Sequence, residues 1–324
     1  MAHDETYIYS QLSAASVSHF VTLHYDVPEP LRCKFYVLGL HDNYVIESGG
    51  EKFILRMYRN DWRSREDVFF ELELLSFLRE RNGQVAGPVR TADGRLAFEV
   101  ESPEGLRMAA LFYYADGCAP EEAISVDQCT LLGRTVANVH SIAESFVTRH
   151  TRPVLDIPYL LDKSVADIYP FIGPDHHTYL EQLKNRLHSI LAGLKKEAGV
   201  FEICHGDVNP KNFHINADKR ITLFDFDQCG YGFRAFEVGK FSSSLHSHSM
   251  KCMLMSAFLD GYQQVRPLTR QEYDLIPYFE MVAVIWVMAV HAQNANRIGY
   301  KFLEKSFWDR KLTLLKELDA RKEH

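Results

Sequence analysis

Short runs of apolar residues in the first part of the chain predict a small antiparallel sheet. These runs are rich in β-branched and aromatic residues, and Gly39 and Gly49-Gly50 break them. The turn-forming sequence Ser102-Pro103-Glu104-Gly105 divides the last two of them. The predicted strands lie at residues 33–38, 43–47, 52–58, 95–100 and 107–113. A short helix is expected before them, over about residues 10–20.

Helical periodicity begins inside this region and dominates the rest of the chain. Residues 63–81 carry apolar side chains at helical spacing and end at Asn82-Gly83. After Gly117 further helices are expected at residues 126–142, 176–194, 236–245, 251–262, 271–293 and 308–318, with a loop and a short helix at 156–169. The sequence therefore predicts an α+β fold, with a small antiparallel-sheet lobe in residues 1–114 and a mainly helical lobe in residues 115–324.

Composition and charge describe an ordinary globular protein. The chain has 324 residues, of which 46% are apolar and 24% are charged, so it can bury a large core. Its formal net charge of −7 argues against a nucleic-acid partner, because phosphate backbones are bound by basic surfaces. A mildly acidic protein would suit a cationic substrate, but such acidity mostly serves solubility.

Cysteine usage and hydropathy indicate a cytoplasmic protein. The six cysteines include no Cys-x-x-Cys pair, so neither a zinc ribbon nor a disulfide framework is expected. Residues 1–5 lack the basic start and apolar core of a secretory signal. The most apolar run, residues 281–290, is far shorter than the roughly 20 residues that span a bilayer, so we expect a buried core helix there.

The candidate chemistry centres on the stretch from Cys204 to Asn212. An apolar strand at residues 200–204 leads into His205-Gly206-Asp207, and Asn212 follows Asp207 by five positions. This is the spacing of a kinase catalytic loop, H-x-D-x-x-x-x-N. Asp207 would take the proton of an attacking hydroxyl, and the amide oxygen of Asn212 would bind a metal on the nucleotide phosphates. His205 is expected to brace the loop.

A second acidic motif follows on a predicted hairpin. Residues 213–215 and 221–224 flank a turn-rich link, and Asp225-Phe226-Asp227 comes at the hairpin's end, where kinases carry Asp-Phe-Gly. Asp225 is therefore a candidate ligand of Mg²⁺. Asp227 could hold a second metal, directly or through water, or could be a helix cap or a solvated acid.

Together, the His-Gly-Asp and Asp-Phe-Asp motifs resemble those of the aminoglycoside phosphotransferase and choline kinase superfamily. The run from Asp225 to Val238 is most similar to the branch of type II homoserine kinases and bacterial stress-response kinases. The resemblance implies a protein-kinase-like fold of two lobes. It also implies transfer of phosphate from ATP, with Mg²⁺, to the hydroxyl of a small molecule such as a homoserine-like amino alcohol or an aminoglycoside.

The resemblance also points to nucleotide-binding residues in the first lobe. Arg56 stands at the strand position where protein kinases carry a lysine that holds the α- and β-phosphates, and a guanidinium can grip phosphate oxygens with two hydrogen bonds. Glu71, on the first long helix, is expected to pair with this cation, with Glu66 and Glu73 as rivals. Asn43 resembles a residue common beside the phosphate loop in this family.

In the family the hinge that reads the edge of adenine lies near residues 111–114 of this chain. Leu111 and Tyr113 are therefore candidate nucleotide-binding residues, through their backbone groups. No acceptor-binding residue follows a motif that can be matched.

Three alternative functions remain open at the level of sequence. A protein serine or threonine would present the same kind of hydroxyl to Asp207, so a bacterial stress-response protein kinase fits the motifs. A pseudokinase that only binds ligands is favoured by Arg56 and opposed by the intact Asp207, Asn212 and Asp225. A metallophosphoesterase could use the same aspartates around two metals, but its Gly-Asn-His-Asp signature is missing.

Overall fold

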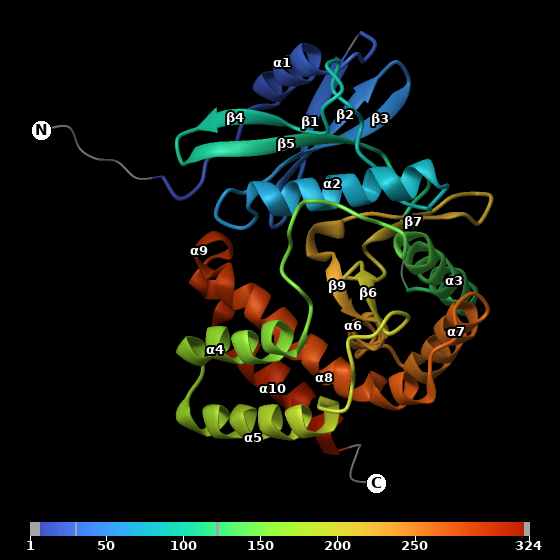
Figure 1. The fold of residues 1–324 in the computed structure, drawn as a ribbon. Helices are drawn as coiled ribbons and strands as arrows, with labels where there is room; N and C mark the ends of the chain where they lie inside the picture. Colours follow the sequence, from blue (N-terminus) through green and yellow to red (C-terminus); the bar gives the residue numbers. More distant parts are fainter. Residues whose placement is uncertain (1–6, 30, 121–122, 321–324) are drawn as a thin grey trace, which may run out of the picture. The chain divides into compact units, whose positions relative to one another are not determined.

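The computed structural model describes residues 7–29, 31–120 and 123–320, and these form two compact units (Figure 1). The first unit contains the described residues up to Cys118, together with Ser145–Arg152 and His214–Phe224. The second contains the described residues of Ala119–Glu144, Pro153–Phe213 and the chain from Asp225 onward. The expectation about a secretory signal concerns residues 1–5, which lie outside the described residues.

The first unit is built on a five-stranded antiparallel sheet with the strand order β1-β2-β3-β5-β4. The pairing of β1 with β2 and of β2 with β3 confirms the predicted meander. Alternate residues of β2 are buried, as expected for a strand with one face on a core. The strands are β1 (Leu31–Leu38), β2 (Asp42–Ser48), β3 (Glu51–Met57), β4 (Phe98–Ser102) and β5 (Gly105–Tyr113).

Two helices belong to this unit, α1 (Ala14–His24) and α2 (Arg65–Glu80). Helix α1 starts later than predicted because the Ser13 hydroxyl accepts a hydrogen bond from the Ser16 amide and so caps the helix. Its Val17 and Val21 are fully buried in the core on the sheet. Helix α2 begins with a capping box formed by Ser64 and Asp67.

The second unit is mainly helical, so the predicted α+β fold class is confirmed. Helices α3 and α7 approach so closely that a β-carbon on Gly261 would lie 2.0 Å from the backbone oxygen of Thr130. Helix α8 packs on both α6 and α10. The helices are α3 (Val126–Ala143), α4 (Ser164–Ile168), α5 (Pro174–Leu191), α6 (Arg234–Ser244), α7 (Lys251–Gln263), α8 (Arg270–Gln293), α9 (Ala295–Ile298) and α10 (Lys305–Ala320). Shorter helical turns are η1 (Pro158–Lys163), η2 (Tyr169–Phe171), η3 (Phe226–Gln228) and η4 (Tyr300–Leu303).

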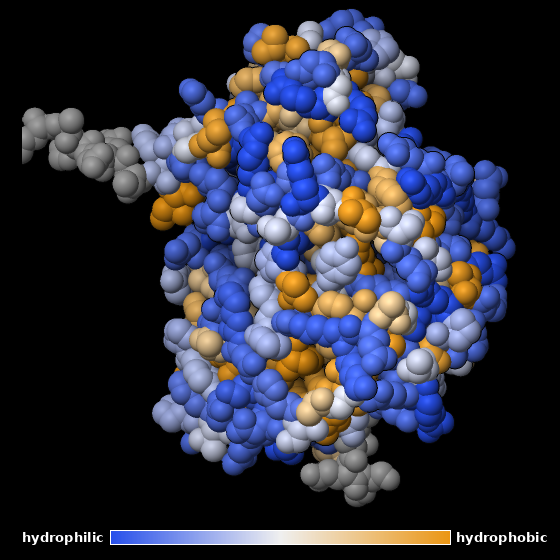
Figure 2. Space-filling view, in the orientation of Figure 1, coloured by the Kyte–Doolittle hydropathy of each residue, from blue (hydrophilic) through white to orange (hydrophobic). Residues whose placement is uncertain are grey.

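Helix α8 is the one helix of the described residues that is long and apolar enough to cross a membrane by length and composition. However, 72% of its apolar window is buried inside the structure, which is the behaviour of a core helix. Hydrophobic residues on the face of the described chain in Figure 2 form separate small areas within a mostly hydrophilic surface. The prediction of a buried core helix at residues 281–290 is therefore confirmed.

Two small sheets support the segments that carry the candidate chemistry. Strand β6 (Phe201–Cys204) pairs with β9 (Gly230–Phe233), and β7 (Phe213–Ile215) pairs with β8 (Ile221–Leu223). The hairpin of β7 and β8 was predicted, whereas β9 was not. Strand β9 escapes sequence patterns because it contains Gly230 and Gly232, and Gly232 is needed where a β-carbon would lie 2.8 Å from the Leu155 side chain.

Candidate active site

A buried carboxylate holds the loop that follows β6. Glu237 of α6 is fully buried, and its two oxygens accept hydrogen bonds from the backbone amides of His205 and Gly206, the latter at 3.0 Å. Two successive amides are thereby fixed by one side chain, and such hydrogen bonds to a charged acceptor are strong. The turn between β6 and Asp207 is therefore rigid at its start.

Gly206 brings the two motifs into direct contact. It has a φ of +80°, and a β-carbon on it would lie 2.2 Å from the backbone oxygen of Gln228. Only glycine fits such a conformation at such a distance. Beside it, the ring of the buried His205 lies 4.3 Å from the ring of Phe226. These contacts agree with the expected bracing role of His205.

Asp207 is held by an amide on one oxygen and an ammonium on the other. Its Oδ2 accepts a hydrogen bond from Asn212 Nδ2 at 2.8 Å, so the two residues predicted from their spacing lie together. Its Oδ1 lies 2.6 Å from Lys240 Nζ, and the Asp207 side chain is still 31% exposed. Asp207 thus presents an oriented carboxylate that a ligand can reach.

The candidate metal ligands offer oxygen atoms, which suit Mg²⁺. The Nδ2 group of Asn212 donates to the carboxylate and the backbone oxygen of Asp207, which leaves the amide oxygen Oδ1 for a ligand. Asp227 is buried and accepts from Gln228 Nε2 at 3.0 Å. Asp225 sits at the end of the hairpin in a left-handed conformation, with φ 61° and ψ 59°. Asn212, Asp225 and Asp227 therefore offer the oxygen ligands that a hard divalent cation prefers.

The first unit brings together the residues predicted around the Arg56 cation. Arg56 of β3 forms an ion pair with Glu71 of α2 at 3.1 Å, and the Glu71 side chain is 1% exposed. Asn43 Oδ1 accepts from Arg56 Nε at 3.3 Å, and the Tyr58 hydroxyl donates to Glu71 at 3.2 Å. The rivals Glu66 and Glu73 contact His150 instead. The partner of Arg56 is therefore Glu71, while its role toward a nucleotide stays a prediction.

Leu111 lies in the core and does not offer a backbone edge to a ligand. Its side chain is fully buried, its amide donates to the Tyr25 hydroxyl, and its carbonyl accepts from the Val89 amide. We therefore correct the prediction for Leu111, because its peptide groups are used within the unit. Tyr113 is 37% exposed, its amide donates to Gly87, and the Arg79 guanidinium lies 3.9 Å from its ring centroid.

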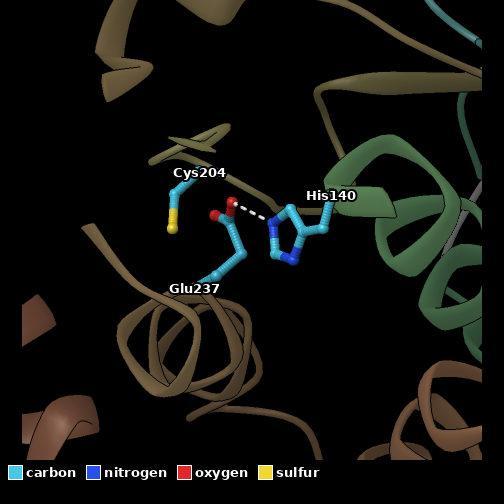
Figure 3. A group of neighbouring side chains, drawn as sticks. All are labelled: His140, Cys204 and Glu237. Carbon is cyan, nitrogen blue, oxygen red and sulfur yellow. Dashed lines mark hydrogen bonds and ion pairs between the residues drawn. The ribbon is translucent and has the colours of Figure 1, made fainter. Parts of the chain in front are cut away.

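His140, Cys204 and Glu237 form a buried group whose atoms lie close enough to share a metal ion (Figure 3). Each already has another function. His140 contacts the Tyr262 hydroxyl at 2.8 Å as well as Glu237, and Glu237 holds the loop. Burial raises the pKa of the Cys204 thiol well above its ordinary value, which keeps it protonated, whereas metals bind the thiolate. The group therefore acts as a hydrogen-bonded support of the loop.

Sequence reasoning did not single out Glu237 or Lys240 as site residues. Both lie on α6, where nearly every position is buried, so charged side chains there need partners. The signal that could have found them is a glutamate and a lysine, three positions apart, within this buried helix. Their partners on the loop, about thirty positions earlier, could not be read from spacing.

Comparison with known proteins places the chain among phosphoryl-transfer enzymes. Residues 36–274 match the phosphotransferase enzyme family. An uncharacterized protein of Synechocystis sp. is 36% identical over 318 residues, covering 97% of this chain and 87% of the relative. A homoserine kinase of Rhodopseudomonas palustris is 26% identical over 279 residues, covering 83% of this chain and 81% of the relative.

Two solved structures share the fold over nearly the whole chain. A microcompartment-associated aminopropanol kinase has a TM-score of 0.78 at 20% identity, covering 94% of this chain and 95% of the other. Amicoumacin kinase, solved in complex with AMP-PNP, Ca²⁺ and Ami, has a TM-score of 0.80 at 20% identity, covering 96% of this chain and 94% of the other. The predicted protein-kinase-like fold is thus confirmed.

Proposed function

Because the chain belongs to the phosphotransferase enzyme family, we propose that it is a kinase that transfers the γ-phosphoryl group of ATP, with Mg²⁺, to the hydroxyl of a small molecule. The observation that carries this proposal is the Asp207 carboxylate, oriented by Asn212 and Lys240 and still accessible. The acceptors named for its relatives, homoserine and aminopropanol, support a small amino alcohol or amino acid. We further propose a cytoplasmic location, which suits six free cysteines.

In the proposed reaction Asp207 acts on the acceptor. The acceptor hydroxyl oxygen bonds to the γ-phosphorus while the bond from that phosphorus to the bridging oxygen breaks, and ADP leaves. The hydroxyl proton passes to the Asp207 carboxylate. Because such transition states have little nucleophile bonding, orientation by Asn212 and Lys240 contributes more than base strength.

The remaining residues bind the donor. Asn212, Asp225 and Asp227 would hold Mg²⁺, which neutralises charge on the donor phosphates when bound. Arg56 would bind phosphate oxygens, with Glu71 and Asn43 fixing the direction of its guanidinium. The backbone carbonyl of Tyr113 is the remaining candidate for reading adenine, because the Tyr113 amide already donates to Gly87.

The Asp207→Asn variant tests this proposal. Asparagine keeps the size of the side chain but removes the negative charge, so we expect ATP-dependent phosphorylation to fall by at least about a hundredfold. Binding of Mg·ATP, measured by calorimetry, should stay within about threefold, because Asp207 is assigned to the acceptor.

Asp218→Asn is the matched control, since Asp218 is exposed in the turn between β7 and β8. It should turn over at the normal rate in a screen of hydroxyl compounds for ADP release. Normal turnover by Asp207→Asn would remove the base assignment. Lack of Mg·ATP binding by the unmodified protein would contradict the whole proposal.

A further inference from the structure

Lys240 is a buried cation at the candidate active site. Its side chain is 5% exposed, and its Nζ lies 2.6 Å from Oδ1 of Asp207. Within the part of the chain that the structure describes, Asp207 is the one acceptor that this ammonium contacts. An ammonium carries three N–H donors, and a buried cation is stable only when its remaining donors are also satisfied. The Lys240 ammonium therefore still has donors for the oxygen atoms of a ligand.

Helix α6 fixes the position of this ammonium. Glu237 and Lys240 are three positions apart, so they share one face of the helix. Glu237 accepts hydrogen bonds from the amides of His205 and Gly206. Lys240 contacts the residue that follows them, Asp207. Two side chains of a single helix thus hold three successive residues of the loop, and the ammonium is fixed beside the carboxylate before any ligand binds.

The candidate site contains more acidic than basic groups. Its carboxylates are those of Asp207, Asp225 and Asp227. The transferred phosphoryl group is also anionic, and in the transition state its charge is spread over three oxygens. Mg²⁺ offsets this charge where the metal binds, whereas the carboxylate of Asp207 repels it. Lys240 is the cation at that carboxylate, because the other cation of α6, Arg234, pairs with Glu272 of α8 at 2.8 Å.

We propose that Lys240 is a catalytic residue of the proposed kinase, and that its ammonium donates a hydrogen bond to an oxygen of the phosphoryl group during the transfer. The inference rests on the proposed function and goes beyond the orientation of Asp207. Reacting atoms lie about 3–3.5 Å apart before the bond forms, so the phosphoryl oxygens come next to the residues that bind the acceptor hydroxyl. An ammonium fixed at this place stabilises the charge of the transition state.

The ammonium acts through its charge and exchanges no proton. The new bond forms between the acceptor oxygen and the phosphorus, and the bond from the phosphorus to the bridging oxygen of ADP breaks. The hydroxyl proton passes to Asp207, while Lys240 keeps its three protons throughout. Because the contact is strongest in the transition state, it raises kcat more than the affinity for Mg·ATP.

Two neutral variants separate this role from the orientation of Asp207. Lys240→Gln removes the charge but keeps an N–H donor for Asp207, whereas Lys240→Met removes both. Calorimetry compares the binding of Mg·ADP alone with that of Mg·ADP and aluminium fluoride, which mimics the phosphoryl group in transit. We expect both variants to bind the aluminium fluoride complex at least about tenfold more weakly, and to bind Mg·ADP within about threefold of the unmodified protein.

Lys251→Met is the matched control, because Lys251 also pairs with a buried carboxylate of the second unit, that of Glu280. The control should keep both affinities. If Lys240 only orients Asp207, Lys240→Gln will bind the aluminium fluoride complex as tightly as the unmodified protein does, and the inference is overturned. If one of the two Lys240 variants fails to fold, as judged by circular dichroism, the other still provides the comparison.

The Asp207→Asn background provides a second measurement. If the ammonium acted only through the carboxylate, Lys240→Met would have no further effect once Asp207 is neutral. We expect instead that Lys240→Met again weakens binding of the aluminium fluoride complex by at least about tenfold. Equal affinities of the single Asp207→Asn variant and the double variant would make Lys240 a positioning residue and contradict the inference.

Failure of this inference can be told apart from failure of the proposed function. If the unmodified protein phosphorylates hydroxyl compounds and Lys240→Gln does so equally well, the protein is a kinase and only the role of Lys240 is wrong. If the unmodified protein binds neither Mg·ATP nor Mg·ADP, the kinase proposal fails, and the role of Lys240 fails with it.

Discussion

A single side chain, Glu237, determines the geometry of the loop that carries Asp207. Its carboxylate accepts hydrogen bonds from two backbone amides, and it also contacts the ring of His140 at 3.4 Å. Because the group is fully buried, water cannot replace a lost partner. The loop and the fold therefore depend on the same residue.

Glu237→Gln should expose this dependence. The amide of glutamine turns a donor toward one of the two backbone amides, which leaves that amide without an acceptor. We expect the free energy of unfolding to fall by about 1–3 kcal/mol in urea titrations. Turnover should fall even in the folded fraction, because Asp207 loses its orientation. An unchanged midpoint and rate would show that the loop is held by other contacts.

Asp225 is a candidate metal ligand and also has a left-handed backbone conformation. The Asp225→Asn variant tests the metal-binding role without disturbing that conformation. Asparagine adopts this conformation readily, so we expect the melting temperature to change little. Loss of the charge should weaken magnesium-dependent nucleotide binding by at least about tenfold, as measured by calorimetry with and without Mg²⁺. Equal binding with and without the substitution would exclude Asp225 as a metal ligand.

At the scale of single residues, the sequence predicts contacts between residues that are close together along the chain. Asp207 and Asn212 lie in one short loop, so their spacing already required that they meet. The Arg56–Glu71 pair could be anticipated only through the family, because three glutamates on α2 were possible and burial selects one. Lys240 was missed because its partner lies on another element. The peptide groups of Leu111 are taken by Tyr25 and Val89, which no local pattern reveals.

At the scale of elements, periodicity and capping account for most of the helices and strands. The predicted helix at 126–142 corresponds to α3, whose start is fixed by the capping box of Ser125 and Gln128. The predicted loop and short helix at 156–169 correspond to η1 and α4, whereas strand β9 was not predicted, because tertiary packing determines it. The close crossing of α3 and α7 also depends on glycines whose role is invisible in sequence.

Gly261→Ala tests that crossing. Its β-carbon would overlap the Thr130 backbone oxygen of α3, so the helices must separate. We expect a loss of about 1–3 kcal/mol in the free energy of unfolding, measured with denaturant. Gly193→Ala is the control, since the nearest atom to its β-carbon would be 3.7 Å away. A stability equal to that of the control would mean that the helices pack less tightly than described.

At the scale of the whole molecule, the reactivity of the cysteine thiols measures how well each unit is packed. Cys118 of the first unit and Cys252 of the second are exposed, whereas Cys129, Cys204 and Cys229 are buried. At pH 8 we expect two thiols to react rapidly with a thiol reagent and the buried three only after unfolding. Cys33 should react slowly at this pH, because burial raises its pKa to about 11 and the thiolate is the reactive form.

Raising the pH toward 11 should therefore accelerate the reaction of Cys33 as its thiolate forms. Peptide mapping of the labelled protein would assign each site. Rapid labelling of Cys204 at pH 8 would contradict its place in the buried group of His140, Cys204 and Glu237 (Figure 3).

The division of the chain into units has a consequence for its synthesis. The first unit includes residues 214–224, the hairpin that directly precedes Asp225. During translation this unit cannot be completed until two thirds of the polypeptide has left the ribosome, by which time much of the second unit is already present. A fragment ending at residue 118 would contain the whole five-stranded sheet but would lack the two later segments of its unit, residues 145–152 and 214–224. It would therefore lose the contacts that His150 makes with Glu66 and Glu73 of α2.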